Sequence, residues 1–248
     1  MTRVAYVSGG GTGIGRATAA ALAGDGWAVV VLGRRPDPLA GTVEAVRAQV
    51  PGAEVHPVAA DLAEPEQVER AVAEAAAAAG PAVDGIVNVA GGTSTLPAGT
   101  LAEVAAEWSD EWRLNVLTAV LLTTALLPRL RTPDARVITL SSIAALRGGG
   151  SYGAAKAALH PWTWDLAARL GSGGTANVVA PGYVEETEFF RDSMTPRRRE
   201  TLIGQTTTGR PGRPADVAET IRWLLSPAAG HVSGQVVQVN GGALLGRG

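Results

Sequence analysis

A tyrosine and a lysine four residues apart form the sequence's strongest chemical pattern, Tyr152-x-x-x-Lys156. Positions i and i+4 share a helix face, so the phenol and the ammonium can converge on one site. A free phenol, with a pKa of about 10, is a poor base at neutral pH, but a neighbouring ammonium stabilises the phenolate and lowers the pKa. The pair therefore predicts a proton donor and acceptor suited to interconverting a carbonyl and an alcohol.

Lys156 is the only lysine among the 21 basic residues of the chain. The arginine-rich, alanine-rich composition is typical of a G+C-rich coding bias, under which lysine positions tend to become arginine. In an arbitrary sequence a Tyr-x-x-x-Lys pattern is more often an interfacial tyrosine beside a solvated lysine. The single lysine favours the chemical interpretation here.

The glycine-rich segment Ser8–Gly15 lies between a predicted first strand and first helix. Glycines permit a tight turn and a close approach of backbone to phosphate, and a helix N-terminus offers unpaired N–H groups. A flexible turn is the alternative, but the placement favours a dinucleotide pyrophosphate site. The residues expected to line it are Gly9, Gly11, Thr12, Gly13, Ile14 and Gly15.

Two arginines, Arg34 and Arg35, stand at the end of the second predicted strand. A dinucleotide-binding fold often has a carboxylate there, which accepts from the ribose 2′-OH of NAD, whereas an arginine attracts a 2′-phosphate. The sequence therefore predicts NADP(H). The alternative is a solvated loop pair.

Polar residues follow three further strands: Asp61, the segment Asn88–Gly92, and the pair Ser141-Ser142. Alone, the aspartate would be a helix cap and the asparagine part of a turn. Ligands of open parallel sheets bind beyond the carboxyl ends of the strands, which is where Asp61 and the Asn88–Gly92 segment are expected. Ser141-Ser142 stands at the end of the fifth predicted strand.

Valine-rich apolar runs alternate with alanine-rich segments of helical length, which predicts βαβ units. Strands are expected at 3–8, 27–33, 53–60, 84–89, 135–141, 175–180 and 235–240, and helices at 13–24, 38–50, 65–79, 101–131, 151–170 and 214–225. The expected fold class is α/β, with all of 1–248 in one doubly wound parallel sheet covered by helices on both faces. The irregular segment 183–213 is expected to form a lid or substrate loop.

Composition excludes several classes of protein. The formal charge of −2 gives no long-range attraction to nucleic acid or an anionic bilayer, and the absence of cysteine removes disulfides and thiolate metal sites. No segment has the roughly 20 apolar residues that a membrane span needs. We expect a cytoplasmic protein that acts on a small molecule, with no metal site.

Together these motifs resemble the short-chain dehydrogenase/reductase family, and the resemblance covers essentially the whole chain. Ser8–Gly15 is similar to the family's Thr-Gly-x-x-x-Gly-x-Gly, and Asn88–Gly91 is similar to its Asn-Asn-Ala-Gly. Gly209–Ala218 and Ser233–Gly242 resemble its closing signature. The resemblance implies catalytic roles for Asn115, Ser142, Tyr152 and Lys156, and cofactor contacts from Asp61, Leu62, Asn88, Ala90, Gly91, Tyr152, Lys156, Pro181, Gly182 and Val184.

Three departures from the family pattern concern details of the site. Ser142 precedes Tyr152 by only ten residues, so one wall of the substrate pocket is expected to differ. One extra residue precedes Thr187, which is thereby shifted in the sequence from the position of the threonine that contacts the carboxamide in the family pattern. Asn240 replaces the usual aspartate.

The resemblance implies a nicotinamide-dependent ketone reductase, similar to reductases of 3-oxoacyl groups on acyl carrier protein, and Arg34 and Arg35 make NADPH the expected cofactor. Gly171–Gly174 lacks the basic residue that such reductases often carry, which weakens the carrier-protein interpretation. The alternatives are an alcohol or sugar dehydrogenase working in the oxidative direction, and a non-catalytic dinucleotide-binding sensor or scaffold. We expect a homotetramer, with a dimer as the second possibility.

Overall fold

Seven parallel strands form one sheet in the order β3-β2-β1-β4-β5-β6-β7. The computed structural model describes residues 2–96, 99–190 and 194–246. The strands are β1 (Val4–Ser8), β2 (Ala28–Gly33), β3 (Val55–Ala59), β4 (Gly85–Asn88), β5 (Ala135–Leu140), β6 (Gly174–Pro181) and β7 (Val236–Val239). Most central strand residues are fully buried, as expected for strands covered on both faces.

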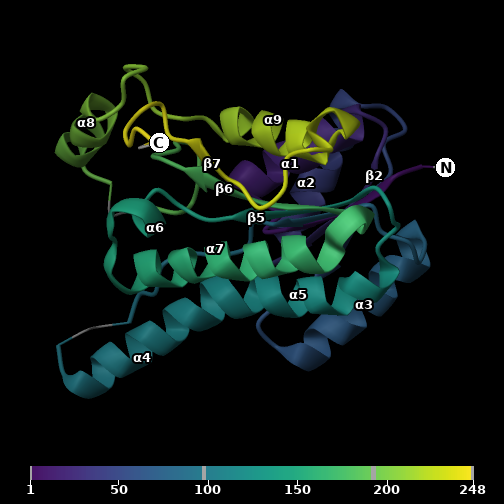
Figure 1. Ribbon diagram of the computed structural model, residues 1–248, viewed down its shortest axis with the longest axis horizontal. Helices are drawn as coiled ribbons and strands as arrows, with labels where there is room; N and C mark the ends of the chain where they lie inside the picture. Colours follow the sequence, from purple (N-terminus) through teal and green to yellow (C-terminus); the bar gives the residue numbers. More distant parts are fainter. Residues whose placement is uncertain (1, 97–98, 191–193, 247–248) are drawn as a thin grey trace.

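Helices cover both faces of the sheet (Figure 1). One layer holds α1 (Gly13–Gly24), α2 (Pro36–Gln49) and α9 (Pro214–Leu225), and its core includes Leu22, Val43 and Ile221. The other holds α3 (Pro65–Ala79), α4 (Leu101–Trp112), α5 (Thr118–Leu126) and α7 (Gly150–Leu170), and its core includes Val72, Leu122 and Leu166. This is the doubly wound α/β architecture that the sequence predicts.

The strand order reverses between β1 and β4, which are neighbours in the sheet but not in the sequence. The ends of these strands coincide, because Ser8 lies opposite Asn88 in the parallel register. The chain leaves them toward opposite faces of the sheet, which opens a crevice between the two connections. Ligands of doubly wound sheets bind at such a switch point.

The predicted strands and five of the six predicted helices are confirmed to within a few residues. The single helix expected over 101–131 is helical from Leu101 to Arg129, but it is not regular: a π-helical turn, Arg113–Leu117, lies between α4 and α5, and a 3-10 turn, Leu127–Arg129, ends it. Two helices were not predicted: α6 (Ala144–Arg147) and α8 (Pro196–Gly204).

The segment expected to form a substrate loop, 183–213, is partly helical, because α8 lies within it. Thr195 caps this helix by accepting a hydrogen bond from the Arg198 N–H at 3.2 Å. Residues 191–193 of the segment lie outside the described part of the chain. Beyond α8, the backbone of Thr207 donates to Gly241, which joins the segment to the C-terminal turn.

Within the described ranges, no helix is long and apolar enough to cross a membrane. The same ranges contain no group of three or more His, Cys, Asp or Glu side chains placed to hold a metal ion.

Candidate active site

The glycine-rich turn joins β1 to α1 at the switch point, and Ser8 ties it to the end of β4. The Ser8 hydroxyl accepts hydrogen bonds from the backbone N–H groups of Val89 and Ala90, both at 3.0 Å. Gly9 has a φ of +65°, and a Cβ there would lie 3.0 Å from the Ala90 nitrogen. A Cβ on Gly15 would lie 2.1 Å from the Gly9 oxygen, so the turn closes only with glycine at that position.

Side chains from α1 and α2 bind the backbone of this turn. Arg16 Nη2 donates to the Gly11 carbonyl at 2.8 Å, and Thr42 Oγ1 donates to the Gly10 carbonyl at 3.0 Å. Thr12 is the N-cap of α1, but its side chain makes no capping hydrogen bond. The N–H groups of the first turn therefore remain available to an anion, which fits a pyrophosphate.

The remaining residues of the turn have structural surroundings that agree with this use. Gly13 has a φ of +49°, and a Cβ there would lie 3.1 Å from Thr187 Cγ2. Thr187 thus returns to the turn despite the extra residue before it. Ile14 packs against the core beneath α1 and α2.

Arg34 and Arg35 lie at the carboxyl end of β2 and are both exposed. Arg35 is the N-cap residue of α2 and forms an ion pair with Glu188 from the segment after β6. The two guanidinium groups therefore stand at the edge where a ribose 2′-substituent is expected.

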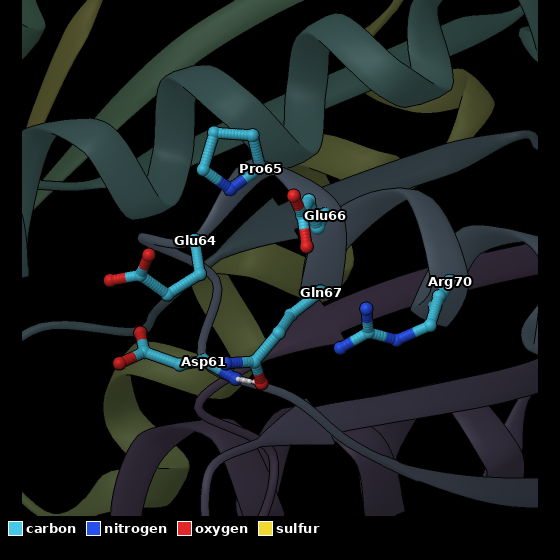
Figure 2. A pocket seen from close by; sticks show the side chains of 6 residues that line it. All are labelled: Asp61, Glu64, Pro65, Glu66, Gln67 and Arg70. Carbon is cyan, nitrogen blue, oxygen red and sulfur yellow. Dashed lines mark hydrogen bonds between the residues drawn. The ribbon is translucent and has the colours of Figure 1, made fainter.

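Asp61 lies directly after β3, where its carboxylate accepts from the Ala63 N–H at 3.0 Å and pairs with Arg113 at 2.7 Å. Partial burial works against ionisation, but these donors hold the pKa of Asp61 below its ordinary value. A hollow of about 590 Å³ opens beside it at the start of α3. Figure 2 shows Asp61 and Gln67 at its edge, joined by a hydrogen bond from the Asp61 N–H to Gln67 Oε1.

Leu62 and Asn88 are both buried. Asn88 Nδ2 donates to Thr123 Oγ1 at 2.9 Å, whereas its Oδ1 atom has no hydrogen-bond partner within the described residues. A buried amide oxygen without a partner at the switch point fits a site that a ligand donor completes.

Tyr152 lies in the first turn of α7. The chain between Ser142 and Tyr152 contains α6 and three glycines. Burial raises the pKa of Tyr152 to about 12, opposed by a hydrogen bond with the Ser142 side chain and reinforced by the charge of Glu111. The expected lowering of this pKa is therefore wrong, because burial and the charge of Glu111 raise the pKa by more than the Ser142 hydrogen bond lowers it. The phenol remains protonated at neutral pH.

Lys156, one turn further along α7, is only 3% exposed. Its ammonium donates to the Leu140 carbonyl at 3.1 Å, at the end of β5. Burial lowers the pKa of Lys156 to about 8, and the charge of Glu111 opposes that shift. The lone lysine is thus a buried cation of the sheet edge and not a solvated surface group.

Asn115 lies in the π-helical turn, and its side chain is completely buried. Asn115 Nδ2 donates to the Gly92 carbonyl at 2.9 Å, and Oδ1 accepts from the Gly92 N–H at 3.1 Å. Gly91 separates this amide from the ammonium: a Cβ on Gly91 would lie 2.6 Å from Asn115 Oδ1 and 2.9 Å from Lys156 Nζ. The structure therefore brings together Asn115, Lys156 and the turn after β4.

Pro181 and Gly182 end β6 at the same sheet edge. The Pro181 carbonyl accepts from the Ile143 N–H at 2.8 Å, next to Ser142. A Cβ on Gly182 would lie 2.9 Å from Asn240 Cα. Asn240 Nδ2 donates to the Leu244 carbonyl at 3.1 Å, a bond that the aspartate of the family pattern could not donate.

The segment after Gly182 covers the site with aromatic rings. Val184 is buried, and the ring of Phe189 lies 5.2 Å from that of Tyr152. Phe190 lies 5.0 Å from Phe189 and 5.3 Å from Tyr183. A cavity of about 390 Å³ is lined by Tyr183, Val184, Glu185, Glu186, Thr187, Phe190 and Met194.

Sequence reasoning missed Glu111 and Glu188. Glu111 is a buried carboxylate in contact with Asn115, but its position among Glu107 and Asp110 resembles a solvated helix face. Its spacing of four residues before Asn115 was the available signal. No sequence pattern indicated that Glu188 reaches Arg35.

Comparisons with known proteins agree with this geometry. The family model described as "Enoyl-(Acyl carrier protein) reductase" matches residues 9–243. The short-chain reductase protein NovJ of Streptomyces niveus is 33% identical, with 96% of this chain and 93% of NovJ covered. The 3-oxoacyl-[acyl-carrier-protein] reductase FabG of Staphylococcus aureus is 30% identical, with 99% of both chains covered.

A solved short-chain type dehydrogenase/reductase from Mycobacterium ulcerans superposes with a TM-score of 0.88 at 30% identity, covering 99% of this chain and 91% of that one. These matches run along nearly the whole chain, and they agree with the sheet order and with the glycine-rich turn at its switch point. The protein therefore belongs to the short-chain dehydrogenase/reductase family.

Proposed function

We propose that the protein uses NADPH to reduce a ketone to a secondary alcohol. The observation that carries the proposal is the gathering of Ser142, Tyr152, Lys156 and Asn115 at one sheet edge, with a protonated phenol facing the Ser142 hydroxyl. Members of this family are oxidoreductases that bind a nicotinamide dinucleotide. The relative NovJ is named a short-chain reductase, and the relative FabG a 3-oxoacyl-[acyl-carrier-protein] reductase.

The turn Ser8–Gly15 would hold the pyrophosphate, Asp61 and Leu62 would border the adenine, and Asn88, Ala90 and Gly91 would line the inner edge. Pro181, Gly182 and Val184 would border the nicotinamide. When bound, the nicotinamide supplies the hydride. Two observations support this arrangement: Thr12 does not cap the first turn of α1 with its side chain, and the Asn88 oxygen has no hydrogen-bond partner among the residues that the structure describes. Arg34 and Arg35 support NADPH over NADH, because a guanidinium favours a phosphate dianion.

Tyr152 would donate its proton to the ketone oxygen while the carbonyl carbon is reduced, and the Ser142 hydroxyl would donate a hydrogen bond to the same oxygen. The charge of Lys156 would stabilise the phenolate that remains until a proton returns. Asn115 would hold the loop after β4 in place and would bind the water that returns the proton to Tyr152.

The substrate pocket is expected to accept a ketone with an apolar substituent. Phe189, Phe190 and Tyr183 cover the site, and Val184 and Met194 add further apolar lining. The short connection between Ser142 and Tyr152 contains α6, so that wall is a helical turn followed by glycines.

The oxidative alternative would be favoured if the arginines do not bind phosphate, and a sensor or scaffold if no turnover occurs at all. The experiment is spectrophotometric: NADPH and NADH are each mixed with the protein and a panel of activated aryl and aliphatic ketones. NADPH oxidation that depends on both protein and ketone is expected. Turnover with secondary alcohols alone would favour a dehydrogenase that works in the oxidative direction. Cofactor binding without any turnover would favour a non-catalytic sensor or scaffold.

A further inference from the structure

Glu111 is a buried carboxylate that the proposed reaction does not use. It lies on α4, one helical turn before Asn115, and is only 2% exposed. Its Oε1 atom accepts from the Ser94 N–H at 2.7 Å, and its Oε2 atom accepts from Asn115 Nδ2 at 2.8 Å. A charged group is rarely buried this deeply unless it has a partner of opposite charge.

The positive charge available to it is the ammonium of Lys156. Asn115 Oδ1 and Lys156 Nζ both lie within 3 Å of the point where a Cβ of Gly91 would stand, so one amide separates carboxylate from ammonium. Among the described residues, Glu111 is the carboxylate whose charge acts on Lys156. Lys156 is itself buried, so it needs a nearby negative charge to remain protonated.

Several influences on the pKa of Glu111 oppose one another. Burial raises this pKa most, and the negative charges of Glu107 and Asp110 on the same helix raise it further. The hydrogen bond from the Ser94 N–H and the positive charge of Lys156 lower it. The charge of Glu111 also acts on Tyr152, across the same space. The carboxylate therefore interacts with both members of the Tyr-Lys pair.

We propose that Glu111 is a positioning residue of the active site, which fixes the Asn115 amide and serves as the counter-ion that keeps Lys156 protonated. The proposal rests on the proposed function for its catalytic meaning, but its physical content concerns two side chains and does not require turnover. The carboxylate would widen the pH range over which Lys156 stabilises the Tyr152 phenolate. Loss of the carboxylate would narrow that range from the alkaline side.

The single lysine makes this directly measurable. Protein labelled with ¹³Cε-lysine gives one side-chain resonance, because Lys156 is the only lysine in the sequence. Its midpoint is expected near 8 in the wild type, since burial lowers the pKa of Lys156 to about 8. In Glu111→Gln the midpoint is expected about one pH unit lower, because a neighbouring opposite charge is lost.

Glu107→Gln is the matched control, because Glu107 lies one turn earlier on α4 and accepts from the Ser151 hydroxyl instead of Asn115. It is expected to leave the Lys156 midpoint in place. In the wild type, the resonance should also show a second inflection at acidic pH, above the ordinary titration of a glutamate, where Glu111 ionises. Glu107→Gln should retain this inflection. Because the inflection is measured in the wild type, it tests the proposal even if Glu111→Gln does not fold.

An unchanged midpoint in folded Glu111→Gln, or a wild-type resonance with no second inflection, would overturn the proposal. The kinetic counterpart is the alkaline limb of kcat/KM for ketone reduction, which should move to lower pH in Glu111→Gln. A variant that lost activity equally at all pH values would show a structural role instead. The NMR titration needs no substrate, so absence of ketone reduction would overturn the proposed function and leave this result standing.

Discussion

Arg35, at the start of α2, forms an ion pair with Glu188, which lies in the segment that follows β6. One of the two arginines expected to bind a 2′-phosphate is therefore held by a carboxylate of the segment that covers the site. Both side chains are more than half exposed, at 59% and 52%. An exposed pair of this kind contributes at most about 1 kcal/mol, so a phosphate dianion can displace the carboxylate.

Glu188→Gln is expected to tighten NADPH binding by about twofold to fivefold, because the competing carboxylate contributes less than about 1 kcal/mol. NADH binding should not change. Fluorescence titration of both cofactors checks this. Glu185→Gln is the control, since Glu185 belongs to the same segment but pairs with Arg199. Weaker NADPH binding in Glu188→Gln would show that the ion pair assists the cofactor site.

Arg34→Asp is expected to reverse the cofactor preference from NADPH to NADH. A charge-assisted contact with the 2′-phosphate, of about 1.5 to 3 kcal/mol, would become a repulsion. The ratio of kcat/KM for the two cofactors in wild type and variant measures the change. Equal Michaelis constants for NADPH and NADH in the wild type would already contradict the assignment of these arginines.

Gly91→Ala is expected to lower turnover by more than tenfold while the protein remains folded. The added Cβ would lie 2.6 Å from Asn115 Oδ1 and 2.9 Å from Lys156 Nζ, so one of these groups must move. Steady-state kinetics and a thermal melt together test this. Gly92→Ala is the matched control, because a Cβ there meets no atom within 4 Å. Equal turnover in the two variants would refute the close approach at Gly91.

The exposed tryptophans of α4 and α7 are expected to be covered in an oligomer. Trp108, Trp112 and Trp164 are about half exposed, and apolar area of this kind on neighbouring helices is typical of protein interfaces. We expect a homotetramer, with a mass four times 25.2 kDa by light scattering. Trp164→Glu should shift the protein to smaller species. A wild-type mass near 25 kDa at micromolar concentration would exclude stable assembly.

Positions set by local rules could be predicted from the sequence. Gly15 and the Ser8 hydroxyl follow from the demands of a tight strand-to-helix turn, and Tyr152 and Lys156 follow from helical spacing. The π-helical turn at Asn115 could not be predicted, because apolar residues continue the helical pattern across it, and the bond from Asn115 to Gly92 joins residues 23 positions apart in the sequence. Long-range contacts such as Arg35 with Glu188, 153 residues apart, leave no local pattern.

The pKa of Tyr152 shows a different limit of sequence reasoning. The spacing to Lys156 indicates a charge that lowers the pKa, but burial and the charge of Glu111 raise it to about 12. The burial of Tyr152 involves contacts with residues distant in the sequence, such as Phe189, and the influence of Glu111 comes from another helix. The sign of the shift therefore needed the three-dimensional structure.

The central claim is that Tyr152 supplies the proton for ketone reduction, and Tyr152→Phe tests it most directly. The variant removes only the hydroxyl and keeps the ring that packs 5.2 Å from Phe189. With NADPH and a ketone that the wild type reduces, kcat is expected to fall by about 100-fold or more, as for loss of a general acid, while NADPH affinity changes little. Near-normal kcat in the folded variant would contradict the account.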